Sequence, residues 1–413
     1  MTLGIYVHWP FCVSKCPYCD FNSRVAGEID QARWRRALLR DLDHFAAETT
    51  GRTVGSLFFG GGTPSLMAPE TVAAIVDAVR RHWTVSPDLE ISLEANPGTV
   101  DRGRFLALRA AGITRLSLGV QSLNEEALRF LGRVHGVAEA LDAIALAGAT
   151  FPRLSLDLIH ARPGQTVAGW REELERALSF GAGHLSLYQL GIETGTAFHR
   201  LQARGDLVLP DEDEATRLFE VTQEVTAAAG LPAYEVSNHA RPGEECRHNL
   251  AGWRGMDYVG IGPGAHGRLT GGDGGGGETD AVYQHPSPGT WLRLVESRGH
   301  GTHERARLHA DERAEELLLI GLRLVEGVDR RRFHRLTGRP LTVAPEVLAR
   351  LDGFIDLDDR VLRATPAGRL ALNEVLRVLL ALCGFRKPAL ECEGARRMLT
   401  RRCRRPPGEP DGR

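Results

Sequence analysis

The sequence predicts an α/β protein, in which a partial barrel of six strand–helix units precedes a smaller α+β domain with a winged-helix-like order of elements. Three observations support this. Short apolar segments alternate with helical patterns from residue 1 to about 240. Residues 241–290 form an irregular, glycine-rich connecting segment, and residues 291–381 then show mostly helices and one hairpin. Repeated strand–helix units build a parallel sheet covered by helices.

The strands expected in residues 1–240 are short and apolar, and each ends in Gly, Pro or a polar residue. They span residues 3–8, 54–59, 89–94, 115–118, 154–159 and 184–190. Helical patterns lie at 31–47, 69–82, 101–111, 125–131, 137–147, 167–180 and 211–229. Functional side chains of such a sheet collect at the carboxyl ends of its strands.

The region 291–381 predicts the smaller domain. Helices are expected at 311–325, 329–336, 345–351 and 366–380, with a hairpin at 354–362. Residues 382–413 are basic and proline-containing, and we expect them to form a disordered tail.

The overall charge excludes a general affinity for nucleic acids or anionic membranes, because 53 acidic residues balance 51 Lys and Arg. No run of 18 apolar residues predicts a transmembrane helix. The chain passes from Met1 directly into a strand, so no signal peptide is expected. These features predict a cytoplasmic protein whose seven cysteines stay reduced.

Three of these cysteines form the strongest chemical signal. Cys12, Cys16 and Cys19 follow the first strand with C-x3-C-x2-C spacing. Three thiolates can hold three irons of a 4Fe–4S cluster and leave the fourth iron open for chemistry. Structural zinc is the alternative, but zinc prefers four protein ligands, and the next cysteine is Cys246.

Polar or glycine residues stand near the ends of the next four strands. The run Gly60-Gly61-Gly62-Thr63 ends the second strand, Glu94 ends the third, Gln121 follows the fourth, and Asp157 lies in the fifth. Each alone fits a strand-end cap or a solvated turn. Together, at the edge that carries the cysteines, they predict a convergent binding pocket.

The cysteine motif, with Tyr18 before its last cysteine, resembles the signature of the radical S-adenosylmethionine (SAM) superfamily. The resemblance implies that SAM chelates the open iron, and that an injected electron cleaves SAM to methionine and a 5′-deoxyadenosyl radical. It also implies a set of cofactor-binding residues, assigned by motif position. These are Tyr6, Tyr18, Gly61, Gly62, Thr63, Glu94, Gln121, Arg133 and Asp157.

Further motifs resemble the coproporphyrinogen-oxidase-type branch of this superfamily. They lie at residues 6–11, 60–64, 116–122, 131–135, 163–166, 235–238 and 260–266. The branch contains the oxygen-independent coproporphyrinogen III oxidases, which convert propionates to vinyl groups by radical decarboxylation, and the HemW-type heme chaperones. Three features favour the chaperones: Phe21 stands where the oxidase has a fourth cysteine, only five residues precede Tyr6, and residues 246–253 resemble the chaperones' Cys-Arg-His-Asn segment.

The resemblance implies heme as cargo, a heme-accepting respiratory protein, and an electron donor such as a flavodoxin or ferredoxin. It implies at most peripheral membrane contact and no nucleic acid, although five arginines between residues 330 and 339 would suit phosphate contacts. Decarboxylase activity is disfavoured by Phe21, and a radical enzyme with an unknown substrate stays open as an alternative.

The heme ligand stays open at this point. His248, Cys246 and His266 are candidates, and the alternative for His248 is a hydrogen-bonded loop histidine. Two segments depart from the family pattern: Gly252 replaces a tyrosine, and His160-Ala161-Arg162 replaces Tyr-Gly and a small or apolar residue. Arg162 either changes the charge near a porphyrin propionate or is a surface substitution.

Overall fold

The computed structural model describes residues 2–271 and 278–382. The chain divides into two units, Met1–Leu308 and His309–Arg413, and each is described by itself. The predicted tail lies outside the described residues from position 383 onward, as do Cys383, Cys392 and Cys403.

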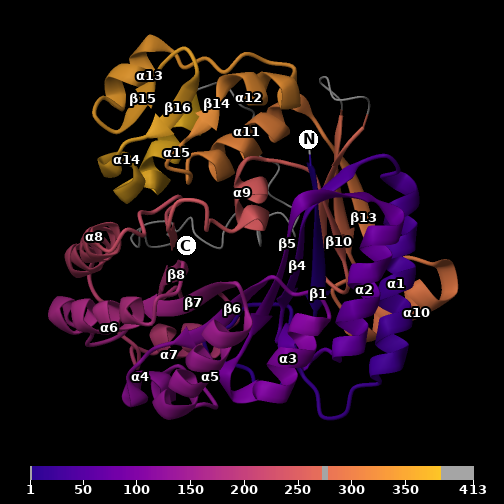
Figure 1. The fold of residues 1–413 in the computed structure, drawn as a ribbon. Helices are drawn as coiled ribbons and strands as arrows, with labels where there is room; N and C mark the ends of the chain where they lie inside the picture. Colours follow the sequence, from indigo (N-terminus) through magenta and orange to yellow (C-terminus); the bar gives the residue numbers. More distant parts are fainter. Residues whose placement is uncertain (1, 272–277, 383–413) are drawn as a thin grey trace. The chain divides into compact units, whose positions relative to one another are not determined.

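The first unit is built on an 11-stranded sheet with the order β13-β12-β11-β10-β1-β4-β5-β6-β7-β8-β9 (Figure 1). Its centre consists of adjacent parallel strands that overlap the six predicted ones. These are β1 (Thr2–Trp9), β4 (Thr53–Gly61), β5 (Thr84–Ala95), β6 (Arg115–Gln121), β7 (Arg153–His160) and β8 (His184–Gln189). The predicted α/β class is therefore confirmed.

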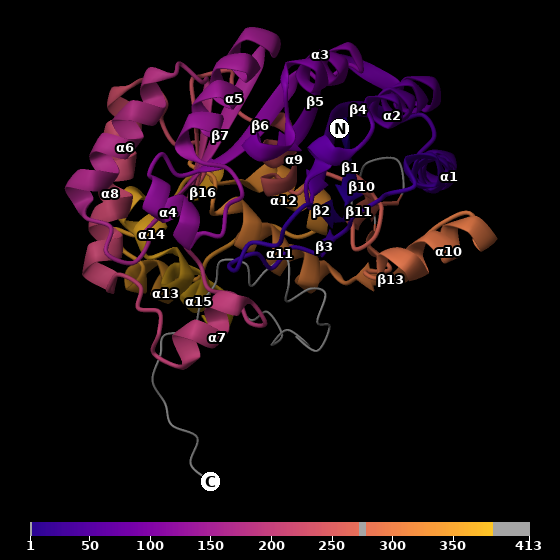
Figure 2. The ribbon, with the colours of Figure 1, turned by 90° about the horizontal axis from the view of Figure 1, so that it is seen from below.

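Helices cover the outer face of this curved sheet (Figures 1 and 2). They are α1 (Gln31–Glu48), α2 (Pro69–His82), α3 (Arg102–Ala110), α5 (Val137–Thr150) and α6 (Val167–Ser179), with the shorter α4 (Glu125–Phe130) and α7 (Ala197–Ala203) and the longer α8 (Glu212–Ala228) beside them. The main core packs outward-facing strand residues such as Leu3, Leu57 and Leu93 against these helices. Full burial of each such side chain contributes about 1.5–3 kcal/mol.

The other face of the same strands is polar. Because strand side chains alternate between faces, Glu90, Ser92 and Glu94 of β5 lie opposite Ile91 and Leu93. Parallel strands covered on both faces are usually apolar throughout. A polar inner face therefore indicates that the sheet holds a site there.

Residues 241–308 differ from the expectation. They contain α9 (Arg247–Trp253), β10 (Tyr258–Ile261), β11 (His266–Thr270), β12 (Thr279–Gln284), α10 (Pro288–Arg298) and β13 (Thr302–Leu308), all in the first unit. The four strands extend the sheet beside β1. Glycines interrupt the apolar pattern of β10 and β11. β13 has alternating charged, exposed side chains. These three segments therefore lacked the sequence pattern of a strand.

Three short strands complete the first unit: β2 (Phe11–Cys12) pairs with β3 (Arg24–Val25), and β9 (Asn238–Ala240) pairs with β8. Short 3₁₀ turns follow β4 at Pro64–Leu66 and β5 at Pro97–Thr99. β2 and β3 flank the cysteine loop and so fix both of its ends.

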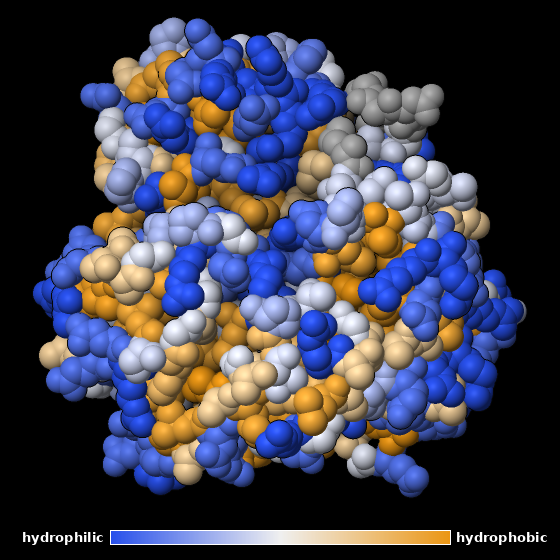
Figure 3. Space-filling view, viewed as in Figure 1, coloured by the Kyte–Doolittle hydropathy of each residue, from blue (hydrophilic) through white to orange (hydrophobic). Residues whose placement is uncertain are grey.

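The second unit contains the predicted helices and hairpin, except that the helix expected at 366–380 is divided into two at Ala371. They are α11 (Ala310–Gly321), β14 (Val328–Asp329), α12 (Arg330–Thr337), α13 (Pro345–Arg350), β15 (Ile355–Leu357), β16 (Val361–Ala364), α14 (Pro366–Leu370) and α15 (Leu372–Leu382). The three strands form a small sheet in the order β14-β16-β15. Hydrophilic side chains gather over α12 (Figure 3). Arg330 donates to the Asp358 carbonyl at 2.8 Å, and Arg339 pairs with Asp311. Both guanidinium groups therefore already have partners within the protein.

Within residues 2–271 and 278–382, no helix combines the length and apolar composition that crossing a bilayer requires.

Candidate functional site

The cysteine loop lies at the carboxyl end of β1. Cys12 is buried at the end of β2, and Cys16 and Cys19 follow, half-buried, in a turn closed by the Cys19 N–H and the Cys16 carbonyl at 3.1 Å. All three thiols are free. The Phe198 N–H donates to the Pro17 carbonyl at 3.0 Å, so α7 supports the loop from outside.

Arg133 contacts this loop from the segment after α4. Its Nη1 lies 3.4 Å from the Cys16 Sγ, and its Nη2 donates to the Gly119 carbonyl at 2.9 Å. Burial raises the pKa of Tyr18, which lies beside Arg133, and also that of Cys19 in the same loop. The guanidinium thus places a positive charge beside Cys16, which suits a site for a negatively charged group.

The predicted glycine run lies against the cysteine loop. Gly61 has φ +114°, and its N–H donates to Glu94 Oε2 at 3.2 Å. A Cβ at Gly61 would lie 2.8 Å from the Trp9 carbonyl oxygen, and one at Gly62 would lie 3.0 Å from the Cys12 Sγ. Both glycines are therefore required by space, and Gly61 by its backbone angle as well.

Tyr6 belongs to a chain of hydrogen bonds that leads to the end of the cysteine loop. His8 Nε2 lies 2.9 Å from the Asn22 carbonyl, so this nitrogen carries the proton and Nδ1 accepts from the Tyr6 hydroxyl at 3.2 Å. Asn22 Nδ2 in turn donates to the Pro263 carbonyl at 2.9 Å. Sequence reasoning missed His8 and Asn22; His8 could have been found, because it lies two residues after Tyr6 on the same strand face.

Gln121 ends β6 in an unusual backbone conformation. Its φ is +68°, and the β6–β7 register shifts between Leu118 and Gln121. Bulges next to active sites redirect side chains. A Cβ at Gly119 would lie 2.9 Å from Gln121 Nε2, so the glutamine side chain folds back over the peptide that also binds Arg133.

Asp157 lies among serines on the inner face of the sheet. It accepts from Ser117 Oγ at 3.0 Å and from Ser155 Oγ at 3.2 Å. Burial raises the pKa of this carboxyl to about 6, against the opposing effect of its hydrogen bonds.

The structure brings several predicted residues together in one small pocket. Cys16, Thr63 and Arg133 line it. The remaining lining residues are Val13, Ser14, Asn96, Thr99, Gly132 and Val134. Cys12 lies against Gly62, and the neighbouring Gly61 is hydrogen-bonded to Glu94. Asp157 does not line this pocket and is hydrogen-bonded to Ser117.

The donor set fits an iron–sulfur cluster. Within the described parts of the chain, no three or more His, Cys, Asp or Glu are arranged to bind a metal ion. A 4Fe–4S cluster binds each thiolate through a different iron, so its ligands do not converge on one point. Three free thiols in one loop, a cation at Cys16 and a glycine cradle at Cys12 suit such a group.

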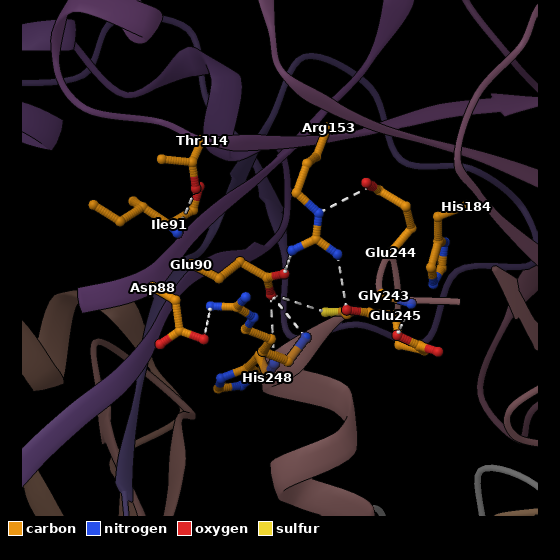
Figure 4. Close-up of polar contacts among 12 residues, drawn as sticks. Asp88, Glu90, Ile91, Thr114, Arg153, His184, Gly243, Glu244, Glu245 and His248 are labelled. Carbon is orange, nitrogen blue, oxygen red and sulfur yellow. Dashed lines mark hydrogen bonds and ion pairs between the residues drawn. The ribbon is translucent and has the colours of Figure 1, made fainter. Parts of the chain in front are cut away.

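A second polar network lies at the opposite ends of the strands, around Glu90 of β5 (Figure 4). Glu90 is 2% exposed, pairs with Arg153 of β7, and accepts the Arg247 N–H at 3.0 Å at the start of α9. The Cys246 thiol donates to the same carboxylate at 3.5 Å. This network joins α9 to the sheet.

Two candidate heme ligands, Cys246 and His248, form hydrogen bonds within the protein, and the third, His266, has a ring contact. Burial raises the pKa of Cys246 to about 12, so its thiol stays protonated. His248 Nδ1 lies 3.2 Å from Ser56 Oγ, and its ring stacks on Phe58 with centroids 5.0 Å apart. The His266 ring lies edge-on to Tyr283 at 4.7 Å.

Arg162 is not a surface substitution. It is 6% exposed and forms an ion pair with Glu173 of α6. His160 is also buried and stacks on Trp170 at 5.3 Å. His160, at the end of β7, and Arg162 after it thus both pack against α6, whereas the other departure, Gly252, lies in α9.

Comparisons with known proteins agree with this geometry. Residues 6–177 match the radical SAM superfamily, and residues 308–371 match the HemN C-terminal domain. The structure of coproporphyrinogen III oxidase (HemN) from Escherichia coli superposes with a TM-score of 0.75 at 23% identity, covering 92% of this chain and 90% of that one. This similarity shows the fold.

Curated relatives cover nearly the whole chain. The mitochondrial radical S-adenosyl methionine domain-containing protein 1 of Bos taurus is 39% identical over 92% of this chain and 87% of its own length. Heme chaperone HemW of Escherichia coli K12 is 39% identical over 92% of this chain and 98% of its own length. HemW of Mycobacterium tuberculosis H37Rv is 38% identical over 91% of this chain and 94% of its own length. With its cysteine loop, glycine cradle and C-terminal domain, the chain belongs to the HemW family of heme chaperones within the radical SAM superfamily.

Proposed function

We propose that this protein is a cytoplasmic heme chaperone that binds heme and delivers it to a respiratory protein. We also propose that it carries a 4Fe–4S cluster and binds SAM. The observation that carries the proposal is the identity of 38–39% to proteins named heme chaperone HemW over more than 90% of the chain. Phe21, where the resembling oxidases have a fourth cysteine, favours the chaperone over a decarboxylase.

The residues fit the two cofactors in a defined way. Cys12, Cys16 and Cys19 would hold the cluster, and Arg133 would neutralise part of its negative charge. The proposed SAM site contains Arg133 and eight further residues: Tyr6, Tyr18, Gly61, Gly62, Thr63, Glu94, Gln121 and Asp157. When bound, the cluster and SAM together would supply one-electron chemistry, with a flavodoxin or ferredoxin as the electron donor. The glycine cradle excludes side chains from the space beside Cys12, and the Tyr6–His8–Asn22 chain fixes the loop's end.

The test is anaerobic reconstitution followed by heme titration, read by visible absorbance, with coproporphyrinogen turnover assayed on the same sample. We expect stoichiometric heme uptake, iron and sulfide in the ratio of a 4Fe–4S cluster, and no decarboxylation. Decarboxylation would overturn the chaperone assignment in favour of an oxidase.

Cysteine variants test the cluster assignment separately. Cys12→Ala, Cys16→Ala and Cys19→Ala should each abolish the charge-transfer absorbance of the cluster, because each removes one iron ligand. Cys246→Ala is the matched control and should keep the absorbance, because its thiol bonds Glu90. A wild-type cluster spectrum in Cys16→Ala contradicts the assignment.

A further inference from the structure

The turn after β6 is held from outside the barrel by a buried ion pair. Arg162, in the loop after β7, pairs with Glu173 of α6, and the two side chains are 7% and 9% exposed. Glu173 Oε1 accepts the Leu123 N–H at 2.7 Å and the Ser122 hydroxyl at 2.5 Å. Arg162 Nη1 donates to the same hydroxyl.

The Ser122 hydroxyl is fully used in this arrangement. It accepts from Arg162 and from the Asn124 N–H at 3.1 Å, and it donates to Glu173. A hydroxyl has one donor and two acceptor positions, so its orientation is fixed. Segments 122–124 and 162–173 are thereby joined through one side chain.

The residue just before this turn is Gln121, whose φ of +68° is costly for a residue with a side chain. Such a conformation persists only where the surroundings impose it. Glu173 holds the turn on one side of Gln121. On the other side, Arg133 holds the Gly119 carbonyl at 2.9 Å and also contacts Cys16.

From these contacts we propose that Arg162 and Glu173 are positioning residues for SAM. The pair fixes the Ser122–Leu123 turn, which keeps Gln121 in its left-handed conformation over the Gly119 peptide and keeps the Gly119 carbonyl in reach of Arg133. Neither residue touches the cofactor. The inference rests on the proposed SAM binding. It adds an ion pair that stabilises the turn beside the SAM site, and one member of that pair, Arg162, is a position at which this chain departs from the family pattern.

Removing only Arg162 would leave Glu173 charged and buried, which can unfold the protein. The test therefore uses two double variants. Arg162→Met with Glu173→Met removes both charges and the hydrogen bonds that these two side chains form with Ser122 and Leu123. Arg162→Met with Glu173→Gln removes the charges but keeps an amide oxygen for both donors. The control is Arg171→Met with Glu224→Gln, an exposed ion pair from the same helix to α8 at 3.0 Å.

SAM affinity is measured by titration into each reconstituted protein, followed through the electron paramagnetic resonance spectrum of the reduced cluster. We expect the dissociation constant to rise at least tenfold in the Met/Met variant, less in the Met/Gln variant, and under twofold in the control, all at unchanged iron content. Met/Met affinity within twofold of wild type overturns the inference. A wild-type protein that does not bind SAM overturns the proposed function instead.

Hydrogen exchange of the cofactor-free proteins provides a readout that does not depend on SAM. The amides of residues 121–123 should exchange at least tenfold faster in the Met/Met variant, whereas those of residues 115–118 in the same strand should not change. Unchanged exchange at 121–123 shows that the pair does not hold the turn and overturns the inference.

Discussion

At the scale of single residues, the structure gives different surroundings to two cysteines that the sequence offers as iron ligands, Cys16 for the cluster and Cys246 for heme. Cys16 is half-buried in the loop beside Arg133, whereas Cys246 is fully buried and donates to Glu90. The thiolate is the reactive form, and burial raises the pKa of Cys246 to about 12. Among the four cysteines that the structure describes, Cys246 is therefore a buried, protonated thiol, whereas Cys16 in the loop has a cation beside it.

This difference predicts a labelling pattern. In the cluster-free protein at pH 8, iodoacetamide should alkylate Cys16 at least tenfold faster than Cys246, which should react only after denaturation. Peptide mass mapping follows each cysteine separately, and a fully denatured sample gives the reference rates. Equal rates in the folded protein would show that Cys246 is accessible and would reopen its candidacy as a heme ligand.

At the scale of elements, α9 depends on one carboxylate of the sheet. Glu90, whose side chain is 1% exposed, accepts the Arg247 N–H and pairs with Arg153 (Figure 4). Two residues earlier in the same strand, Asp88 pairs with Arg247 at 2.7 Å but is 65% exposed. Burial, and not the number of ion pairs, should decide which of the two stabilises the fold.

The two carboxylates therefore form a matched pair for mutation. Glu90→Gln should lower the free energy of unfolding by about 1.5–3 kcal/mol, because it removes the buried charge that accepts from Arg153, Cys246 and the Arg247 N–H, while Arg153 keeps Glu244 as a second partner. Asp88→Asn should lower it by no more than about 1 kcal/mol, because exposed ion pairs contribute little. Urea denaturation at pH 7 measures both. Equal losses for the two variants would contradict a role for burial.

The elements also show which parts of the fold the sequence could predict. The six central strands are apolar on their outward faces, so their pattern is visible in one sequence. β13 exposes every second side chain at the sheet edge, and α9 has only seven residues, so both lacked a periodic signal. The motif residues that adjoin the cysteine loop were predictable by position. Glu173 was not, because an outer-helix glutamate that bonds a backbone N–H leaves no pattern.

At the scale of the whole molecule, buried histidines set the response to acid. Burial holds the pKa values of five of them below the ordinary value, so they are neutral in the folded protein. The pKa is about 4 for His135, His239 and His248 and about 3 for His160. The pKa of the fifth, His184, lies well below its ordinary value. Two carboxyls oppose them, since burial raises the pKa of Asp41 to about 7 and that of Asp157 to about 6.

The sign of the pH dependence follows from the protons bound in each state. Between about pH 4 and pH 6 the unfolded chain protonates the five histidines, whereas the folded protein keeps protons on the two carboxyls. The unfolded state thus binds up to three more protons, so stability rises with pH by at most about 4 kcal/mol per pH unit in this window. Urea denaturation of the cofactor-free protein at intervals from pH 4.5 to 7.5 measures the slope, and stability that is flat or falling toward pH 6 would contradict it.

One variant tests whether histidines cause this slope. His160 stacks on Trp170, and among the described residues its Nδ1 has no hydrogen-bond partner, so phenylalanine can replace it without breaking a bond at that atom. His160→Phe should reduce the slope by about 1.4 kcal/mol per pH unit, because one proton fewer is taken up on unfolding. The control is His199→Phe, at a half-buried position of α7 outside this group of five, and it should leave the slope unchanged. If both variants keep the wild-type slope, the acid sensitivity comes from other groups.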